Sequence, residues 1–292
     1  MRSRITPAQR LPAADFFAAP PPEIGELVSA DTTLRTHKNP LGWGTRISIG
    51  ASLVVIIIGV AFWIASGQRR PADRTAFQVI GALIALGVFG IAIYVTRFKA
   101  VCSYVGKNGM ARFTLHGSRE SIPSTELLLF NTVSELHSSQ TRHFYNGVYT
   151  GTNYVYTWND PNGVVRLKLS GTYRGKDSPP KQGDAWFLAE SGERAWSLYF
   201  LEHANKQLQH LGFIEFAVDR KRRLRIGPGF IEFHFVRSPR VEAQDMAAIS
   251  LSGGQFSFKH KDAKWYSFSG KYSFEYGAMA NARVFLMALD SL

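Results

Sequence analysis

Two uninterrupted apolar segments stand near the N-terminus, ISIGASLVVIIIGVAFWIAS (Ile47–Ser66) and FQVIGALIALGVFGIAIYVT (Phe77–Thr96). Each segment is 20 residues long and contains no charged residue. A helix of about 20 residues, rising about 1.5 Å per residue, spans a hydrocarbon core roughly 30 Å thick. The sequence therefore predicts two transmembrane helices. The short connection Gly67–Ala76 forces them to run antiparallel, as a hairpin.

Basic residues flank the two predicted spans unevenly. Three arginines lie in the connection, at Arg69, Arg70 and Arg74. Seven basic residues lie close to the spans on the side of the chain termini: Arg35, Lys38, Arg46, Arg97, Lys99, Lys107 and Arg112. Cytoplasmic flanks of membrane spans carry the excess of Lys and Arg, so we expect both termini in the cytoplasm. The single cysteine, Cys102, excludes an intrachain disulfide and agrees with a reducing compartment.

The remaining residues divide by composition. Residues 1–40 are rich in proline and alanine and lack an apolar run, which predicts a disordered tail with a short helix around Glu23–Val28. Residues 41–99 hold the predicted membrane hairpin, and residues 100–292 have the composition of a soluble domain. The formal charge of +12 suits nucleic acid, acidic proteins or an anionic bilayer surface. Two membrane spans favour the bilayer surface.

Short runs of alternating apolar and polar residues follow the second span. Tyr154–Trp158 and Val164–Leu169 flank the sequence Asn159–Gly163, and Asn-Gly between such runs is a strong hairpin signal. Two later stretches have helical spacing instead. The other expected strands are Met110–Leu115, Phe230–Phe235, Gln255–Phe258 and Trp265–Phe268, and the expected helices are Glu193–Leu211 and Met279–Leu292.

The two parts of this region resemble each other locally. The sequence VGKNGM at residues 105–110 parallels IGPGF at 226–230, and LSGTY at 169–173 parallels FSGKY at 268–272. Both pairs occur in the same order, each before an expected helix. We therefore predict a tandem repeat, with units at residues 100–212 and 213–292. The first unit carries an insertion of about 20 residues, which we place in the polar, glycine-bearing stretch His137–Gly151.

A strand with this Val-Gly pattern, a series of antiparallel strands and one C-terminal helix resemble the pleckstrin-homology-like (PH-like) fold. Bacterial membrane proteins that carry such a domain after a two-helix hairpin are similar in layout. The resemblance implies an α+β protein of the bacterial inner membrane with two PH-like units. The faces around Trp196 and Phe285 would close the sheets. Members of the family bind lipid headgroups, peptides or proteins and share no common chemistry, so the resemblance implies binding. One larger sandwich is the alternative architecture.

The sequence LSGGQ at residues 251–255 matches the signature of ABC-type ATPases. The phosphate-binding loop that those enzymes need does not occur in the chain, so we interpret these residues as a turn between strands. The densest charge cluster follows Asp219. An anionic membrane would attract it by roughly 1 kcal/mol per basic residue, whereas the alternative is a solvated linker. The predicted lipid-contacting residues are Arg220, Lys221, Arg222, Arg223 and Arg225.

The histidines and acidic residues form no catalytic or metal-binding pattern in the sequence, and we expect no cofactor. Aromatic residues do not alternate with the basic cluster, which argues against nucleic acid as a partner. The sequence therefore predicts a non-enzymatic membrane-anchored module. It would recognise an anionic lipid surface or a partner protein at the cytoplasmic membrane face. The alternative is a structural or assembly subunit of a larger membrane complex, in which small residues of the helices mediate association with a partner or with a second copy.

Overall fold

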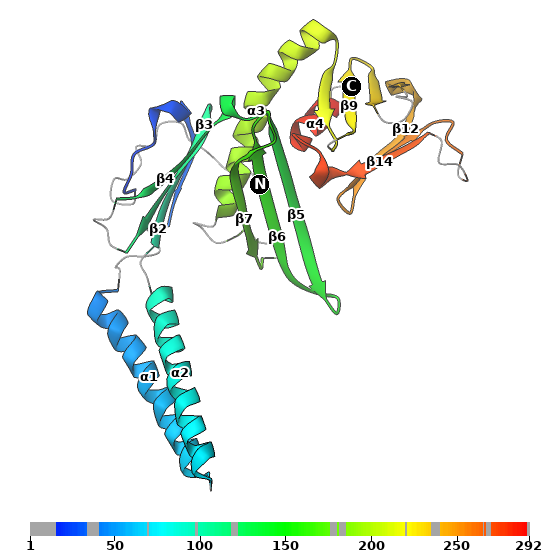
Figure 1. Cartoon of the computed structure of the whole chain (residues 1–292). Coiled ribbons are helices and arrows are strands. Elements are labelled where there is room, and N and C mark those ends of the chain that lie inside the picture. Colours follow the sequence, from blue (N-terminus) through cyan, green and yellow to red (C-terminus); the bar gives the residue numbers. More distant parts are fainter. Residues whose placement is uncertain are drawn as a thin grey trace. The chain divides into compact units, whose positions relative to one another are not determined.

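The computed structural model describes residues 16–33, 41–68, 70–96, 99–117, 122–175, 180, 185–219, 221–234, 240–264, 266 and 270–290. These residues form an α+β protein, in which two long apolar helices are followed along the chain by antiparallel sheets (Figure 1). The fold class is confirmed at this level. The chain separates into two compact units. One unit comprises residues 33–101 and 113–125, and the other comprises residues 1–32, 102–112 and 126–292.

Helices α1 (Trp43–Ser66) and α2 (Pro71–Val95) form the predicted hairpin. Both are long and apolar enough to span a membrane, and most of their side chains are exposed. Each helix begins several residues before the predicted span, because hydropathy marks the apolar run and not the helix start. In α2 the proline at the first helical position, Pro71, fixes a backbone angle that suits a helix start.

Two glycines bring α1 and α2 together. A Cβ atom added to Gly50 would lie 2.7 Å from the ring of Phe89, and one added to Gly81 would lie 2.3 Å from the Cβ of Ala61. Only glycine fits at such distances. A Cβ atom added to Gly59, Gly87 or Gly90 would meet no other atom within 4 Å. Packing within the hairpin therefore explains some of the glycines of these helices and leaves the others on open surface.

Each helix of the hairpin also receives an arginine from the first turn of the other. Arg46 of α1 donates to the carbonyl of Ile93 near the end of α2, and its Nε lies 3.2 Å from Thr96 Oγ1. Arg74 of α2 donates to the carbonyl of Ala65 at the end of α1, at 3.4 Å. The last carbonyls of a helix have no intrahelical partner and carry partial negative charge, so a guanidinium is favourable there.

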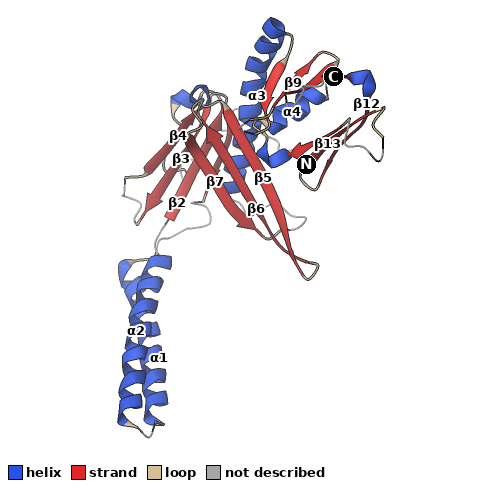
Figure 2. Ribbon diagram, turned by 45° about the vertical axis from the view of Figure 1, so that its right-hand side comes forward, coloured by secondary structure: helices blue, strands red, loops and turns tan. Residues whose placement is uncertain are grey.

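The strands and the remaining helices follow one order twice. In each half a four-stranded sheet, a 3-10 turn, a three-stranded sheet and a helix succeed one another (Figure 2). The turn between the sheets is Phe130–Thr132 in the first half and Ala243–Asp245 in the second, and a further 3-10 turn, Tyr276–Ala278, precedes the last helix. The first set consists of β1 (Leu27–Thr32), β2 (Lys99–Gly106), β3 (Gly109–His116), β4 (Ser124–Leu129), β5 (Glu135–Tyr145), β6 (Val148–Asn159), β7 (Val165–Tyr173) and α3 (Ala185–Leu211). The second consists of β8 (Ile214–Ala217), β9 (Arg223–Gly227), β10 (Phe230–His234), β11 (Arg240–Glu242), β12 (Met246–Ser252), β13 (Gln255–His260), β14 (Lys271–Glu275) and α4 (Ala282–Leu289).

Backbone contacts at corresponding positions of the two sets match. The N–H of Phe130, at the start of the 3-10 turn Phe130–Thr132, donates to the carbonyl of Asn108 in the β2–β3 turn at 2.8 Å. The N–H of Ala243, at the start of the 3-10 turn Ala243–Asp245, donates to the carbonyl of Gly229 in the β9–β10 turn at 2.7 Å. These turns contain the two parallel sequences found above. The recurrence of sequence therefore coincides with a recurrence of local structure.

Residues 16–33, before the hairpin, form secondary structure, whereas a disordered tail was expected over residues 1–40. The rest of that tail, residues 1–15 and 34–40, lies outside the described residues. A 3-10 helix, Pro22–Ile24, leads into β1, and β1 pairs antiparallel with β2. Ile24 is fully buried, and Tyr104 donates to the carbonyl of Ala18. The expected helix near residues 23–28 is thus a strand with one short turn. The partner strand lies some 70 residues further along the chain, so local sequence gave no sign of the pairing.

The predicted hairpin at Asn159–Gly163 is confirmed as the turn between β6 and β7. The strand expected at Trp265–Phe268 lies almost wholly outside the described residues, and the third strand of that sheet is β14. The expected helix at 193–211 begins earlier, at Ala185, and the helix expected at 279–292 is the shorter α4.

Two hydrophobic cores lie under the two sets of strands, and α3 contributes to both. Trp196 is buried in the first core, whereas Ala204, two turns later, is buried in the second. Phe200, between them, packs against both cores. The predicted boundary at residue 212 coincides with the end of α3. However, the helix contributes to the cores of both halves, and β5–β7, α3 and the whole second half belong to one compact unit.

Asn281, just before α4, connects the second half to the first. Its Oδ1 accepts hydrogen bonds from Leu136 N at 3.0 Å and from Trp196 Nε1 at 2.8 Å. Its Nδ2 donates to the carbonyl of Ser134 at 3.0 Å. The backbone φ of 55° is left-handed, a conformation that asparagine tolerates better than most residues.

Candidate functional site

The predicted lipid-contacting cluster lies in the turn between β8 and β9 and on β9 itself. Arg220 lies outside the described residues. Asp219 organises the turn, because its Oδ1 accepts from the backbone N–H groups of Lys221 at 2.9 Å and Arg222 at 2.8 Å. Its Oδ2 accepts from the guanidinium of Arg222. These backbone and side-chain donors lower the pKa of Asp219 to about 2.

The later members of the cluster have acidic or carbonyl partners as well. Arg225 Nε lies 2.8 Å from Glu215 Oε2, and Nη1 of the same guanidinium lies 3.9 Å from Glu232. Arg223 donates to the carbonyl of Asp219 at 2.7 Å. Within the described residues, Lys221 has no acidic partner, and its side chain is exposed. The structure thus brings the cluster together with three carboxylates, which sequence spacing did not indicate.

A polar pocket of about 520 Å³ adjoins this turn. Its lining includes Glu135, His137, Asn159, Asp219 and Arg223. The pKa of Glu135 is lowered, first by its hydrogen bond with His137 and then by the nearby charges of His137 and Arg223. Two carboxylates and one guanidinium line the pocket, so its charge does not favour an anion. Contact with an anionic surface would therefore involve the exposed side of the turn.

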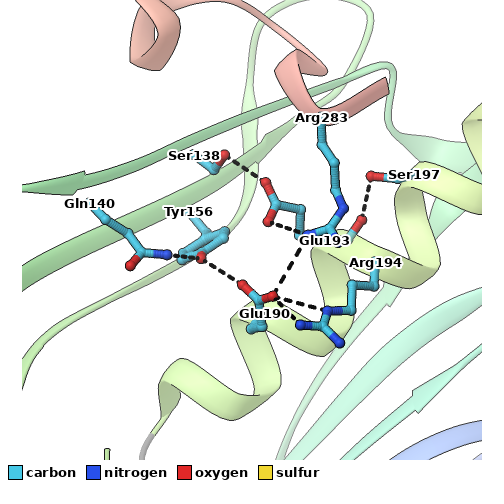
Figure 3. Close-up of polar contacts among 8 residues, drawn as sticks. All are labelled: Ser138, Gln140, Tyr156, Glu190, Glu193, Arg194, Ser197 and Arg283. Carbon is cyan, nitrogen blue, oxygen red and sulfur yellow. Dashed lines mark hydrogen bonds and ion pairs between the residues drawn. The ribbon is translucent and has the colours of Figure 1, made fainter. Parts of the chain in front are cut away.

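A second polar cluster joins α3, β5, β6 and α4 (Figure 3). Glu193 of α3 is 7% exposed and accepts from Ser138 Oγ at 2.7 Å and from Arg283 Nη1 at 3.4 Å. Glu190 accepts from Arg194 at 2.8 Å and from the hydroxyl of Tyr156 at 3.3 Å. Burial raises the pKa of Glu193, and the neighbouring Glu190 adds to the effect.

Perturbed carboxylates occur in catalytic sites and in structural ion-pair networks. Here the carboxylates bind side chains of neighbouring elements, and Arg283 reaches both Glu190 and Glu193 from α4. The arrangement therefore acts as a structural bridge between the two halves. Among the described residues, no group of three or more His, Cys, Asp or Glu side chains is placed to hold a metal ion.

The LSGGQ sequence is confirmed as a turn. Gly253 and Gly254 have φ of +59° and +79° and connect β12 to β13. The stretch His137–Gly151, which was expected to be a polar insertion, forms most of β5 and the start of β6. Large exposed apolar side chains surround the turn at Asn146-Gly147. This Asn-Gly pair carries the same hairpin signal that identified the β6–β7 turn.

No known family model matches the chain, and a comparison with curated proteins finds no related sequence. Function is therefore inferred from the fold and from the surfaces described above.

Proposed function

We propose that the chain is a non-enzymatic, membrane-anchored recognition module whose β region consists of two PH-like units. The observation that carries the proposal is the position of an exposed apolar helical hairpin, between the first two strands of an arrangement that occurs twice. A series of antiparallel strands closed by one helix is the pattern of the PH-like fold. The first unit would comprise β1–β7 and α3, and the second β8–β14 and α4.

In this proposal α1 and α2 cross the bacterial inner membrane and both termini are cytoplasmic. Their length, their apolar composition and the exposure of their side chains support the crossing. The excess of Lys and Arg on the terminal side supports the orientation. A domain tethered in this way stays at high local concentration near the membrane, so that weak contacts become effective.

The recognised surface would include anionic lipid headgroups, contacted by residues 220–225. The described members of the cluster lie near three carboxylates, those of Asp219, Glu215 and Glu232. Five basic residues in the sequence and three carboxylates leave a net charge of about +2. At roughly 1 kcal/mol per charge near an anionic surface, the attraction amounts to about 2 kcal/mol. That energy corresponds to a factor of about 30 in binding.

The proposal is tested with the full chain held in nanodiscs of zwitterionic lipid and mixed with separate vesicles of anionic lipid. Replacement of all five basic residues by alanine is expected to weaken co-flotation with the vesicles at least about 30-fold at low salt. The attraction is screened as salt rises, so the difference is expected to shrink.

A matched control removes charge elsewhere. Lys259 and Lys271 occupy paired positions of β13 and β14, and both are exposed. The double alanine variant at these positions is expected to bind like the wild type, whereas Lys221→Ala combined with Arg223→Ala is expected to weaken binding. Equal binding by all variants at low salt as well as at physiological salt would reject the lipid contact and leave a partner protein as the recognised component.

The alternative is a structural or assembly subunit of a larger membrane complex. The open helix surface at Gly59, Gly87 and Gly90 favours it, because small residues allow helices of different chains to approach closely in lipid. Mild detergent extraction followed by mass spectrometry separates the two functions. A partner recovered in fixed stoichiometry, lost when Gly87 and Gly90 are replaced by leucine, would support the subunit.

A further inference from the structure

The turn between β5 and β6 presents large apolar side chains to solvent. Phe144 is 55% exposed, Tyr145 is 72% exposed and Val148 is 67% exposed. They flank Asn146-Gly147, in which both residues have positive φ, 49° and 78°. This two-residue turn is the type that closes a twisted hairpin most tightly. Three large apolar side chains at the end of one hairpin exceed what a solvent-facing turn requires.

The hairpin holds these side chains in a fixed arrangement. The strands β5 and β6 pair from Glu135–Asn159 to Tyr145–Val148, with one irregularity between His143 and Phe144. The rings of Phe144 and Tyr149 meet edge to face, with centroids 5.8 Å apart. The hydroxyl of Tyr149 bonds Thr152 Oγ1 at 2.7 Å. The exposed side chains therefore project from an ordered support.

The β5–β6 hairpin carries basic residues and lacks acidic ones over most of its length. Residues 136–159 contain no Asp or Glu, although the whole chain has 22 acidic residues. Arg142 and His143 lie directly before Phe144 on the same strand and are exposed. Exposed aromatic rings next to basic groups, in a stretch of sequence without Asp or Glu, match the interface of a bilayer, where headgroups are anionic and the acyl region is apolar.

We propose that the β5–β6 tip, Arg142–Tyr149, inserts into the headgroup–acyl interface of the bilayer and forms a membrane contact separate from α1, α2 and the 220–225 cluster. Phe144, Tyr145 and Val148 enter the interface, and Arg142 stays at the level of the phosphates. The inference rests on the proposed membrane anchoring, which brings the domain to a bilayer. Side chains that lie in this way reach about 5–10 Å into the boundary region.

The proposal is tested by labelling the full chain, reconstituted in vesicles that contain anionic lipid. Tyr145→Cys is coupled to an environment-sensitive fluorophore, and Cys102 does not interfere because it is fully buried. The matched control is Asn162→Cys, in the exposed β6–β7 turn at the other end of β6. We expect a blue shift and quenching by lipids that carry a shallow acyl-chain quencher at residue 145, and neither effect at residue 162.

A second variant pair tests the chemistry of the contact. Phe144→Ser combined with Val148→Ser in the Tyr145→Cys background is expected to abolish the blue shift, because one exposed position alone does not hold the tip in lipid. Quenching at residue 145 that survives this change would overturn the apolar contact. Equal emission at residues 145 and 162 would overturn the insertion itself.

Alkaline extraction of the same vesicles separates this inference from the proposed anchoring. A chain that remains in the membrane pellet but gives no lipid quenching at residue 145 refutes the tip contact alone. A chain released by alkali refutes the anchoring and the tip contact together. A blue shift at residue 145 without lipid quenching, which appears only when a cell extract is added, assigns the tip to a protein partner and overturns the membrane contact.

Discussion

Replacement of Asn281 by alanine is the most decisive perturbation of the two-part architecture. The side chain is 7% exposed and bonds three groups of the first half, Leu136 N, Trp196 Nε1 and the carbonyl of Ser134. Alanine removes all three bonds and leaves the indole N–H of Trp196 and the amide of Leu136 buried without an acceptor. It also places a Cβ-bearing residue without a polar side chain in a left-handed conformation.

The expected loss follows from these terms. Each buried donor left without a partner costs about 1–3 kcal/mol. The left-handed backbone costs about 1 kcal/mol more for alanine than for asparagine, which adopts it readily. The expected decrease in the free energy of unfolding is therefore about 3–7 kcal/mol. Typical total stabilities are about 5–15 kcal/mol, so the variant is close to the limit of folding.

The assay is urea denaturation of the full chain in detergent micelles, followed by near-ultraviolet circular dichroism, with hydrogen–deuterium exchange in parallel. Exchange of the peptide that contains Leu136 is expected to accelerate by about 10² to 10⁵, because each 1.4 kcal/mol is a factor of ten. The second half is expected to lose cooperativity with the first, since the polar contact that joins the start of α4 to β5 and α3 is absent.

Two controls separate the contributions. Asn281→Gly removes the side-chain bonds but relieves the backbone, so it is expected to be less damaging than alanine by about 1 kcal/mol. Asn146→Ala places alanine at the other described non-glycine position with positive φ, an exposed turn, and is expected to cost about 1 kcal/mol. A loss for Asn281→Ala that equals the loss for Asn146→Ala would refute the role of the buried hydrogen bonds.

Three further outcomes are expected. Gly81→Ala is expected to destabilise the helical hairpin by about 1–3 kcal/mol in thermal melts in micelles, because the added Cβ would lie 2.3 Å from the Cβ of Ala61. Gly90→Ala is the control, and it is expected to cause no loss of stability because the space around Gly90 is open. Gly106→Ala lowers the free energy of unfolding in urea by about 3 kcal/mol, because its Cβ would meet the carbonyl oxygen of Ile24 at 2.2 Å, and an unchanged midpoint would contradict this. Burial raises the pKa of Glu193 above 4.5, so its contribution to stability is present below that pH and is lost as pH rises through the folded pKa. Denaturation between pH 4 and 7 should therefore show wild type losing stability relative to Glu193→Gln, and parallel profiles would exclude the shift.

The helical hairpin and the tight turns were predictable because their signals are local. Twenty apolar residues without a charge predict a helix long enough to span a bilayer. Asn-Gly at residues 162–163 fixes a turn between two strands by backbone geometry. The parallel Val-Gly and Ile-Gly sequences also have a local cause. A Cβ at Gly106 would lie 2.2 Å from the carbonyl of Ile24, and one at Gly227 would lie 2.6 Å from the carbonyl of Gly212. In both places the preceding chain passes too close for any side chain.

The parts that sequence reasoning missed depend on contacts between distant residues. The strand β1 is stabilised by β2 and by the burial of Ile24, neither of which a proline-rich segment reveals. The sequence alone suggests that Arg222 and Arg225 are available to bind an anion. In the folded chain they form ion pairs with Asp219 and Glu215. A charge run alone therefore overestimates the potential of a surface, because the sheet places carboxylates from other strands beside it.

The location of the hairpin in the chain explains how two such different parts coexist. Thr32, the last residue of β1, pairs with Cys102 of β2, and the N–H of Thr33 donates to the carbonyl of Val101 at 3.0 Å. The chain therefore leaves the sheet and returns to it at adjacent points. Antiparallel helices joined by a tight connection also begin and end close together. An insertion whose ends already match the spacing of two paired strands adds little strain, and a long loop between such points costs only slowly increasing entropy. In the second half, a turn of a few residues connects the corresponding strands, β8 and β9, and none of the described residues between them is helical. A helical hairpin can thus interrupt a β unit between its first two strands while those strands still pair with each other.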